Sequence, residues 1–209
     1  MLTALQERIC RLVGSLPDAE SAALAGGGAL IVHGIVDRGT TDLDFFSTDI
    51  ADVRPTAQAV HTALEHEGLH VEVRRGGAIL VRLEVTDGHD RTAVDFGPSR
   101  RAFPPVLAET GQVLTPEDLA GDKMAALFSR AAARDFVDVY ALSARFSRSQ
   151  LYELAKDKDT GFVLERLHDA LGTFEHRYRQ DFPVSDDDYE RLRTWVHSWR
   201  ADLPSPHQH

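Results

Sequence analysis

The stretch "LAGGGALIVHGIVDRGTTDLDFFSTD", from Leu24 to Asp49, decides the fold of this 209-residue chain. Three consecutive glycines precede a short apolar segment, and two aspartates separated by one leucine follow it. The segment "TDLDFFS" alternates polar and apolar residues, which is typical of a β-strand. Because residues i and i+2 of a strand point to the same face, we expect Asp42 and Asp44 to project together, with Leu43 and Phe45 turned toward the core.

The two aspartates suggest a metal site. Carboxylates on one face repel each other unless a cation lies between them. Magnesium prefers hard oxygen ligands and is commonly shared with substrate phosphates. The segment "TAVDF" adds a third carboxylate, Asp95, if its strand is a neighbour of the first. The alternative is a solvated strand face, because an isolated Asp-x-Asp pattern is common.

The glycines Gly26, Gly27 and Gly28 lie between a short apolar run and an expected helix. Such a turn exposes backbone N–H groups at a helix start, which favours phosphate binding. Glycine also lets a phosphate approach the backbone closely. A triphosphate bound here could reach magnesium held by Asp42 and Asp44. The alternative is a tight turn that binds no ligand.

The composition narrows the class of protein. Hydrophobic residues make up 43% of the chain and the formal charge is −10, so a core can form, and broad nonspecific nucleic-acid binding is disfavoured. A local basic patch remains compatible with this charge. Cys10 is the only cysteine, which excludes an intramolecular disulfide and a cysteine zinc site. No apolar run reaches the roughly 18 residues of a membrane span, so we expect a soluble cytoplasmic protein.

The pattern of elements predicts an α+β fold with a mixed β-sheet core flanked by helices, followed by an all-helical C-terminal domain. Residues 1–114 mix both element types, whereas 115–209 carry helix signals alone. We therefore place a core domain at 1–114 and a helical domain that closes the active-site cleft at 115–209. The expected helices of the first part are 2–16, 28–36 and 54–68, and its expected strands are 21–25, 41–47, 69–75, 78–86 and 91–97.

The opening stretch resembles the first motif of the nucleotidyltransferase superfamily typified by DNA polymerase beta, and more specifically of the AbiEii/AbiGii toxin family. That family typically has Leu-x-Gly-Gly-Thr-Ala-Leu followed by Arg-x-Ser/Thr-x-Asp-x-Asp-Phe-Phe. Gly28 departs from the pattern, since threonine or serine is usual there and its hydroxyl is expected to touch a phosphate. The matching residues are Leu24, Gly26, Gly27, Ala29, Leu30, Arg38, Thr40, Asp42, Asp44, Phe45 and Phe46.

A second block, "GDKMAALFSRAAARDFVDVYAL", is similar to the later signature of that family. Lys123 matches its lysine, and Arg134, Asp135 and Asp138 match its Arg-Asp-x-x-Asp. The resemblance implies that Lys123 and Asp138 line the site opposite the Asp42–Asp44 strand, with Asp135 or Arg134 bracing them. A lysine can pair with a triphosphate as a point charge, although an exposed helix lysine is the ordinary alternative. Asp138 would be the catalytic base or a metal contact.

The resemblance implies a magnesium-dependent enzyme that moves a nucleoside monophosphate from an NTP to an acceptor hydroxyl. Catalytic residues would be Asp42, Asp44, Lys123 and Asp138, while the glycines, Arg38, Thr40 and Lys123 would bind the nucleotide. It also implies a toxin of a toxin–antitoxin or phage-defence pair, acting on tRNA acceptor ends and paired with a cognate antitoxin. The rivals are transfer to an aminoglycoside-like small molecule or to a protein, and a non-catalytic regulator that binds nucleotide or a partner.

Six arginines form a basic group within this acidic chain, on strands and loops around Asp95. They are either ordinary surface charge or a local basic rim for an RNA acceptor end or nucleotide phosphates. These residues are Arg74, Arg75, Arg82, Arg91, Arg100 and Arg101.

Overall fold

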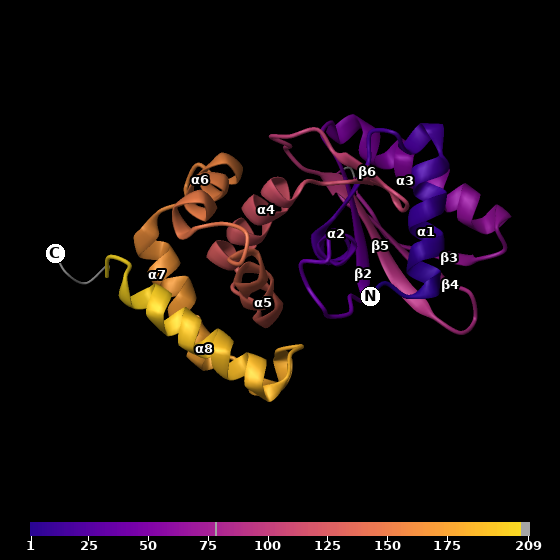
Figure 1. Ribbon diagram of the computed structural model, residues 1–209. Helices are drawn as coiled ribbons and strands as arrows, with labels where there is room; N and C mark the ends of the chain where they lie inside the picture. The colour runs from indigo at the N-terminus through magenta and orange to yellow at the C-terminus, as the bar shows by residue number, and fades with distance from the viewer. Residues whose placement is uncertain (78, 206–209) are drawn as a thin grey trace. The chain divides into compact units, whose positions relative to one another are not determined.

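The computed structural model describes residues 1–77 and 79–205, and a seven-stranded mixed sheet is the central element of its first part (Figure 1). The strand order is β3-β4-β5-β2-β1-β7-β6. The strands are β1 (Ala23–Ala25), β2 (Asp42–Ser47), β3 (His70–Gly76), β4 (Val81–Thr86), β5 (Arg91–Pro98), β6 (Val106–Ala108) and β7 (Gly111–Val113).

The strand that carries the two aspartates lies in the middle of this sheet. β2 pairs in parallel with β5 and antiparallel with β1. Its burial alternates along its length, with Leu43 and Phe45 buried and the residues between them partly exposed. The ring of Phe45 stacks on that of Phe96 from β5, with 5.7 Å between centroids. The strand pattern read from "TDLDFFS" is therefore confirmed.

Two helices cover the apolar face of the sheet. α1 (Ala4–Ser15) and α3 (Ile50–His66) contact each other and several of the strands (Figure 1). A short helix, α2 (Gly26–Val32), follows β1 directly and packs on β1 and β2. A 3₁₀ turn, η1 (Pro17–Ala19), precedes β1. Since α1 and α3 occupy the face of Leu43 and Phe45, the aspartates of β2 belong to the opposite face.

The second part of the chain is helical throughout its described residues. Its core contains Trp199, which is fully buried and donates its indole N–H to the Tyr152 hydroxyl at 2.6 Å. Phe136, Phe174 and Phe182 form another aromatic cluster in the same helical unit. The elements are α4 (Pro116–Ser129), α5 (Ala133–Leu142), α6 (Arg148–Lys158), α7 (Leu164–Gly172), η2 (Thr173–His176), η3 (Arg179–Asp181) and α8 (Asp186–Ala201).

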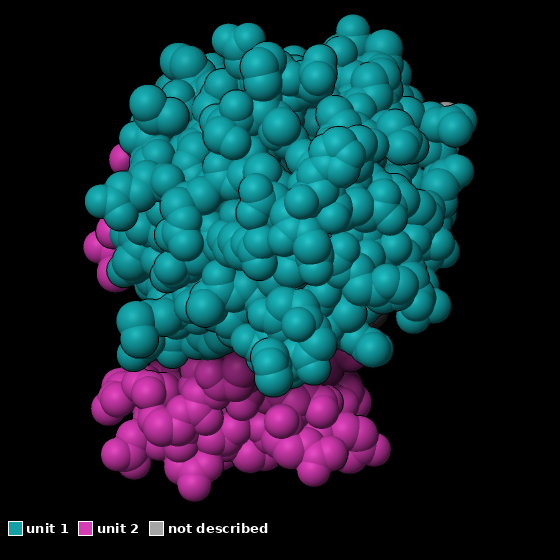
Figure 2. Space-filling view, turned by 90° about the vertical axis from the view of Figure 1, so that its right-hand side faces the viewer, with its two compact units in different colours: residues 1–119 teal, residues 120–209 magenta. Residues whose placement is uncertain are grey.

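The expected fold class, a mixed sheet with flanking helices followed by helices alone, is confirmed. The chain forms two compact units, Met1–Leu119 and Ala120–His209, coloured separately in Figure 2. Their division falls inside α4, five residues after the boundary expected at residue 114. Within the described residues, no helix is long and apolar enough to cross a membrane.

Three local differences from the expected elements have physical causes. α2 begins at Gly26 rather than Gly28, so the glycines form its first turn. α3 begins earlier than expected because the Asp49 side chain accepts the Ala51 N–H at 2.8 Å and caps it. The short hairpin of β6 and β7 was not expected, because strands of three residues carry almost no periodic signal.

Candidate active site

The aspartates of β2 share one face of the sheet. Asp42 and Asp44 alternate with the buried residues Leu43 and Phe45 in the sequence, and both are partly exposed. The Thr40 hydroxyl donates to Asp42 Oδ1 at 2.9 Å and lies 3.1 Å from the Asp42 carbonyl oxygen. A threonine from the preceding loop therefore fixes the first of the two carboxylates.

The third aspartate, Asp95, lies directly beside Asp44 in the parallel register of β5 and β2. Its two oxygens are bound by Arg82 of β4: Nε donates to Oδ1 at 2.7 Å and Nη2 to Oδ2 at 2.5 Å. This hydrogen bond and the Asp95 charge raise the pKa of the Arg82 guanidinium, and the charges of Asp42 and Asp44 add to the effect. The structure thus brings Asp95 to the expected place and adds a cation that sequence reasoning did not assign to it.

Gly26 leaves the space that the Asp44 carboxylate occupies. A Cβ built on Gly26 would lie 1.8 Å from Asp44 Oδ2, and the residue has a φ of +57°. Both facts require glycine, because an L side chain would clash and would strain the backbone. The first glycine of the run therefore serves the close approach of a carboxylate to the start of α2.

Gly27 and Gly28 have different surroundings. A Cβ on Gly27 would lie 3.0 Å from Thr40 Oγ1 and 3.3 Å from Arg38 Nη2, so this glycine faces the polar loop before β2. A Cβ on Gly28 would instead lie 3.2 Å from both Leu24 Cδ1 and Leu43 Cδ2. The position at which the family has threonine or serine is thus directed toward the apolar core, and its side chain would begin between two leucines.

Arg38 is buried beside these glycines and donates from Nη1 to the Gly39 carbonyl at 2.9 Å. Gln6 of α1, which is also buried, holds the same loop from the other side. Its Nε2 donates to the Thr40 carbonyl at 2.9 Å and to Thr92 Oγ1 at 3.2 Å. The Thr-x-x-Gln capping pattern of α1 could have identified Gln6 as a helix cap, but nothing in the sequence linked it to residue 40.

Arg101 belongs to the scaffold rather than to a basic rim. Its Nη2 donates to the carbonyl of Ser21 at 2.7 Å and to that of Phe46. Burial lowers the pKa of its guanidinium, and the nearby Asp118 opposes that shift. Asp118 in turn accepts the backbone N–H groups of Ala102 and Phe103 at 2.9 and 3.1 Å. Sequence reasoning had grouped Arg101 with the surface arginines because a loop arginine gives no signal of such contacts.

The second unit contains its own carboxylates, each with a cation. Lys123 Nζ lies 2.8 Å from Asp138 Oδ2, and their side chains are 9% and 0% exposed. Arg130 binds Asp135 through two bonds of 2.9 Å, and Asp135 also accepts the Ala132 N–H at 3.0 Å. Arg134 is exposed on α5. The Lys123 side chain is therefore buried and not an ordinary exposed helix lysine.

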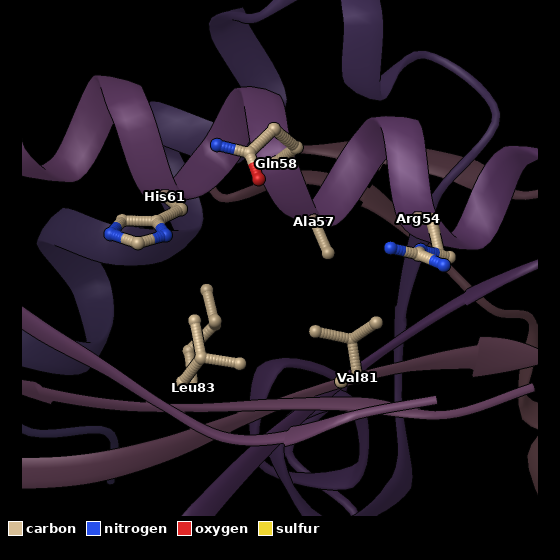
Figure 3. Close-up of a pocket in the computed structure, with 8 residues that line it drawn as sticks. Arg54, Ala57, Gln58, His61, Val81 and Leu83 are labelled. Carbon is tan, nitrogen blue, oxygen red and sulfur yellow. The ribbon is translucent and has the colours of Figure 1, made fainter. Parts of the chain in front are cut away.

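A cavity lies on the α3 side of the sheet, and Figure 3 shows the residues that line it. It has a volume of about 100 Å³ and lies between α3 and strands β3 and β4. Leu83 and Val81 form its floor, and Arg54 and His61 of α3 border it. Because it opens on the α3 face, it is separate from Asp42 and Asp44. Among the described residues, no group of three or more His, Cys, Asp or Glu side chains is placed to hold a metal ion.

Comparison with known proteins gives one family and several solved structures. Residues 11–203 match the family model described as nucleotidyl transferase AbiEii toxin, type IV toxin–antitoxin system. MenT4, a nucleotidyltransferase toxin from Mycobacterium tuberculosis, is similar with a TM-score of 0.62 and 20% identity, over 95% of this chain and 83% of MenT4. JHP933 from Helicobacter pylori has a TM-score of 0.60 and 17% identity, over 96% and 94% of the two chains. No curated protein sequence matches this chain. At these identities the solved structures show a shared fold.

Proposed function

Because the chain belongs to the AbiEii nucleotidyltransferase toxin family, whose model covers residues 11–203, we propose that it transfers a nucleoside monophosphate from an NTP to a hydroxyl at the acceptor end of a tRNA. The family makes the chain a nucleotidyltransferase of a toxin–antitoxin pair, with a nucleotide substrate and a cognate antitoxin. The observation that carries the proposal is the Asp44 carboxylate lying against Gly26, on the same strand face as Asp42. This is a polar, glycine-lined surface suited to a phosphate and a divalent cation.

The residues on this face fit a magnesium ion. Asp42 and Asp44 offer hard carboxylate oxygens, and Gly26 removes the Cβ that would fill the space beside Asp44. Magnesium is often bound by one or two carboxylates together with substrate phosphates. In this proposal Asp42 and Asp44 hold the ion, and Asp95 would join them only by giving up Arg82. When bound, magnesium would offset the negative charge of the triphosphate and lower the pKa of the attacking hydroxyl.

The residues of the chain bind and orient the reactants. The backbone of Gly26 and Gly27, with the Arg38 guanidinium behind it, would receive the triphosphate, and Thr40 keeps Asp42 in place. The acceptor oxygen attacks the α-phosphorus, its proton passes to a carboxylate of this face, and pyrophosphate leaves as the bond to the β-phosphate breaks. Catalysis of this kind depends on positioning and charge stabilisation.

The proposal gives the second unit a part in the same reaction. Lys123 carries three N–H donors, and Asp138 fixes the lysine at 2.8 Å. We propose that Lys123 binds the triphosphate and that Asp138 orients it or accepts a proton. Asp135, held by Arg130 and by a backbone N–H, keeps the connection between α4 and α5 in shape. The family resemblance supports this assignment, and a lysine-to-methionine variant tests it.

The test is a transfer assay with the purified full chain, magnesium, each α-labelled NTP in turn and total tRNA. We expect label to enter tRNA with the parent protein and not with Asp42→Ala or Asp44→Ala. An Asp90→Ala variant is the matched control, because Asp90 lies in an exposed hairpin turn. Parallel reactions contain an aminoglycoside or no added acceptor.

Two outcomes would contradict the proposal. Label in the aminoglycoside or in protein, with none in tRNA, would assign the enzyme a different acceptor. Equal labelling of tRNA by the parent and by Asp44→Ala would show that the β2 carboxylates are not the reactive centre. Loss of transfer on addition of a chelator, restored by added magnesium, would support the metal part of the proposal.

A further inference from the structure

One row of paired residues crosses four strands on the carboxylate face of the sheet. Arg75 of β3 pairs with Arg82 of β4, Arg82 pairs with Asp95 of β5, and Asp95 pairs with Asp44 of β2. Residues directly opposite each other on neighbouring strands have side chains on the same face. The row therefore runs from the candidate reactive carboxylate to the edge of the sheet, and its outer half is positive.

An irregularity in β3 places Arg75 in this row. The register between β3 and β4 shifts between Val73 and Arg75. Val73 pairs with Leu83, which is buried on the α3 side and lines the cavity there. In a regular strand Arg75 would share the face of Val73, because it is two residues further on. The extra residue of the bulge turns Arg75 to the other face, beside Arg82, and bulges commonly re-aim side chains in this way.

Arg82 and Arg75 differ in how their side chains are held. Arg82 is 43% exposed and is held by two of its five N–H donors in the bidentate pair with Asp95. Three donors remain on a guanidinium whose orientation is fixed. Arg75 is exposed, and it has no ion pair with any residue that the structure describes. The adjacent row on this face carries Glu72 and Glu84, and Glu72 is paired with Arg74 at 2.8 Å.

We propose that Arg82 and Arg75 bind successive phosphodiesters of a single-stranded nucleic-acid acceptor whose terminal hydroxyl lies at Asp42 and Asp44. The inference rests on the proposed transfer to a nucleic-acid end and assigns the residues that hold that acceptor. The chain has a net charge of −10, so two neighbouring arginines suit local binding of a few phosphates rather than general nucleic-acid binding. Asp95 acts here as a positioning residue for Arg82.

The width of the sheet sets the length of acceptor that the row can detect. β3 is three strands away from β2, which corresponds to about 14 Å at a strand spacing of about 4.8 Å. A stacked strand rises about 3.4 Å per nucleotide, so Arg75 would lie about four nucleotides from the reacting end. Arg82 would act on shorter acceptors as well.

The experiment measures binding of 5′-labelled single-stranded RNAs of about 3 and about 12 nucleotides to the full chain, without NTP, over a range of salt. For Arg75→Met we expect roughly fivefold weaker binding of the longer RNA and a salt slope reduced by about 0.7. Binding of the shorter RNA should not change. Arg54→Met is the matched control, because it removes the same charge from α3 on the opposite side of the sheet. Equal effects of Arg54→Met and Arg75→Met, or equal effects on both RNAs, would overturn the inference.

A steady-state assay separates this inference from the proposed function. Arg75→Met should raise the KM for the RNA acceptor, with kcat and the KM for NTP nearly unchanged, and Asp95→Asn should raise the same KM. An unchanged acceptor KM in a variant that still labels tRNA would refute the binding of the acceptor by Arg82 and Arg75, but not the proposed function. Failure of the parent to label any nucleic acid would refute both the proposed function and the acceptor binding by these arginines. A higher magnesium requirement in Asp95→Asn would instead identify Asp95 as a metal ligand, and a raised KM for NTP would assign Arg82 to the triphosphate.

Discussion

Asp42 and Asp44 on β2, and Asp135 and Asp138 on α5, are carboxylates on single elements in contrasting surroundings. On α5 each has its own cation, Arg130 or Lys123, and both carboxylates are fully buried. On β2 both are partly exposed, and Arg82, which lies on the same face of the sheet, is bound to Asp95. Burial with a matched cation is how a protein holds a charge for structure or orientation. Adjacent carboxylates at a surface are instead suited to an external cation.

Aspartates that lie close together on one element can therefore affect the free energy of unfolding differently, depending on their burial and on the cations paired with them. Removing a β2 carboxylate takes one of several neighbouring negative charges from a partly exposed face of the sheet. Removing Lys123 takes away the cation that lies 2.8 Å from the buried Asp138 carboxylate, and the loss of one partner of a buried ion pair is costly. Variants can therefore test the activity and the stability of each region separately.

The largest expected effect is the loss of transfer activity in Asp44→Asn. We expect kcat to fall by about 10³-fold, since removal of one preorganised electrostatic group costs about that much. The melting temperature should change little, because the Asp44 side chain is partly exposed and asparagine keeps its size. Transfer assays and thermal unfolding of the same preparation check both parts. A large fall in melting temperature would show that Asp44 supports the fold, and the comparison between the two regions would fail.

The second effect concerns stability. Lys123→Met should lower the free energy of unfolding by about 3–5 kcal/mol, because Asp138 then lies buried without its cation. The double variant Lys123→Met/Asp138→Leu should recover most of that loss, since a buried pair can often be replaced by apolar side chains. Urea unfolding of the parent, single and double variants gives the energies. If the double variant regains stability but no activity, the pair is needed for the reaction itself, whereas regained activity would make it purely structural.

A smaller effect separates Asp135 from Asp138. Asp135→Asn weakens the pair with Arg130, which is itself 52% exposed, and the contact with the Ala132 N–H. We expect a loss of about 2 kcal/mol in the free energy of unfolding. The kcat per folded molecule should be close to that of the parent, because the role of Asp135 is to hold the corner between α4 and α5. A loss of kcat at temperatures where the variant is fully folded would give Asp135 a direct role.

Much of the fold followed from the sequence because its signals are local. The alternation of "TDLDFFS" and the cap at Ser185, which accepts the Asp188 N–H at 3.2 Å, depend on residues close in the chain. The run of helix formers after residue 114 was not one helix, because α4 ends at Ser129 and Ala131 has a φ of 45°. Asp135 holds that break through Arg130 and the Ala132 N–H, and no glycine or proline marks it.

The candidate site was predictable only where it depends on strand periodicity and on a short motif. The common face of Asp42 and Asp44 follows from a period of two. The binding of Asp95 by Arg82 depends on the pairing of β4 with β5, and the contact of Gln6 with the Thr40 carbonyl joins residues 34 positions apart. The position of Gly28 against Leu24 and Leu43 also needs three dimensions. Sequence alone treated this residue as a lost phosphate contact.

Cys10 shows how burial alone changes the pKa of an acidic group that has no ion pair. Burial raises the pKa of its thiol to about 12 from an ordinary value of 9.0. Below pH 9 the thiol is protonated in both states, so the stability is fully present. Above pH 9 the unfolded chain releases a proton that the folded chain retains, so stability falls as pH rises toward 12. Cys10→Ala should remove about 1.4 kcal/mol per pH unit from that slope, measured by urea unfolding from pH 8 to pH 11. An identical slope in the two proteins would mean that the thiol ionises in the folded state, and that burial on this side of the sheet is weaker than the packing of α1 implies.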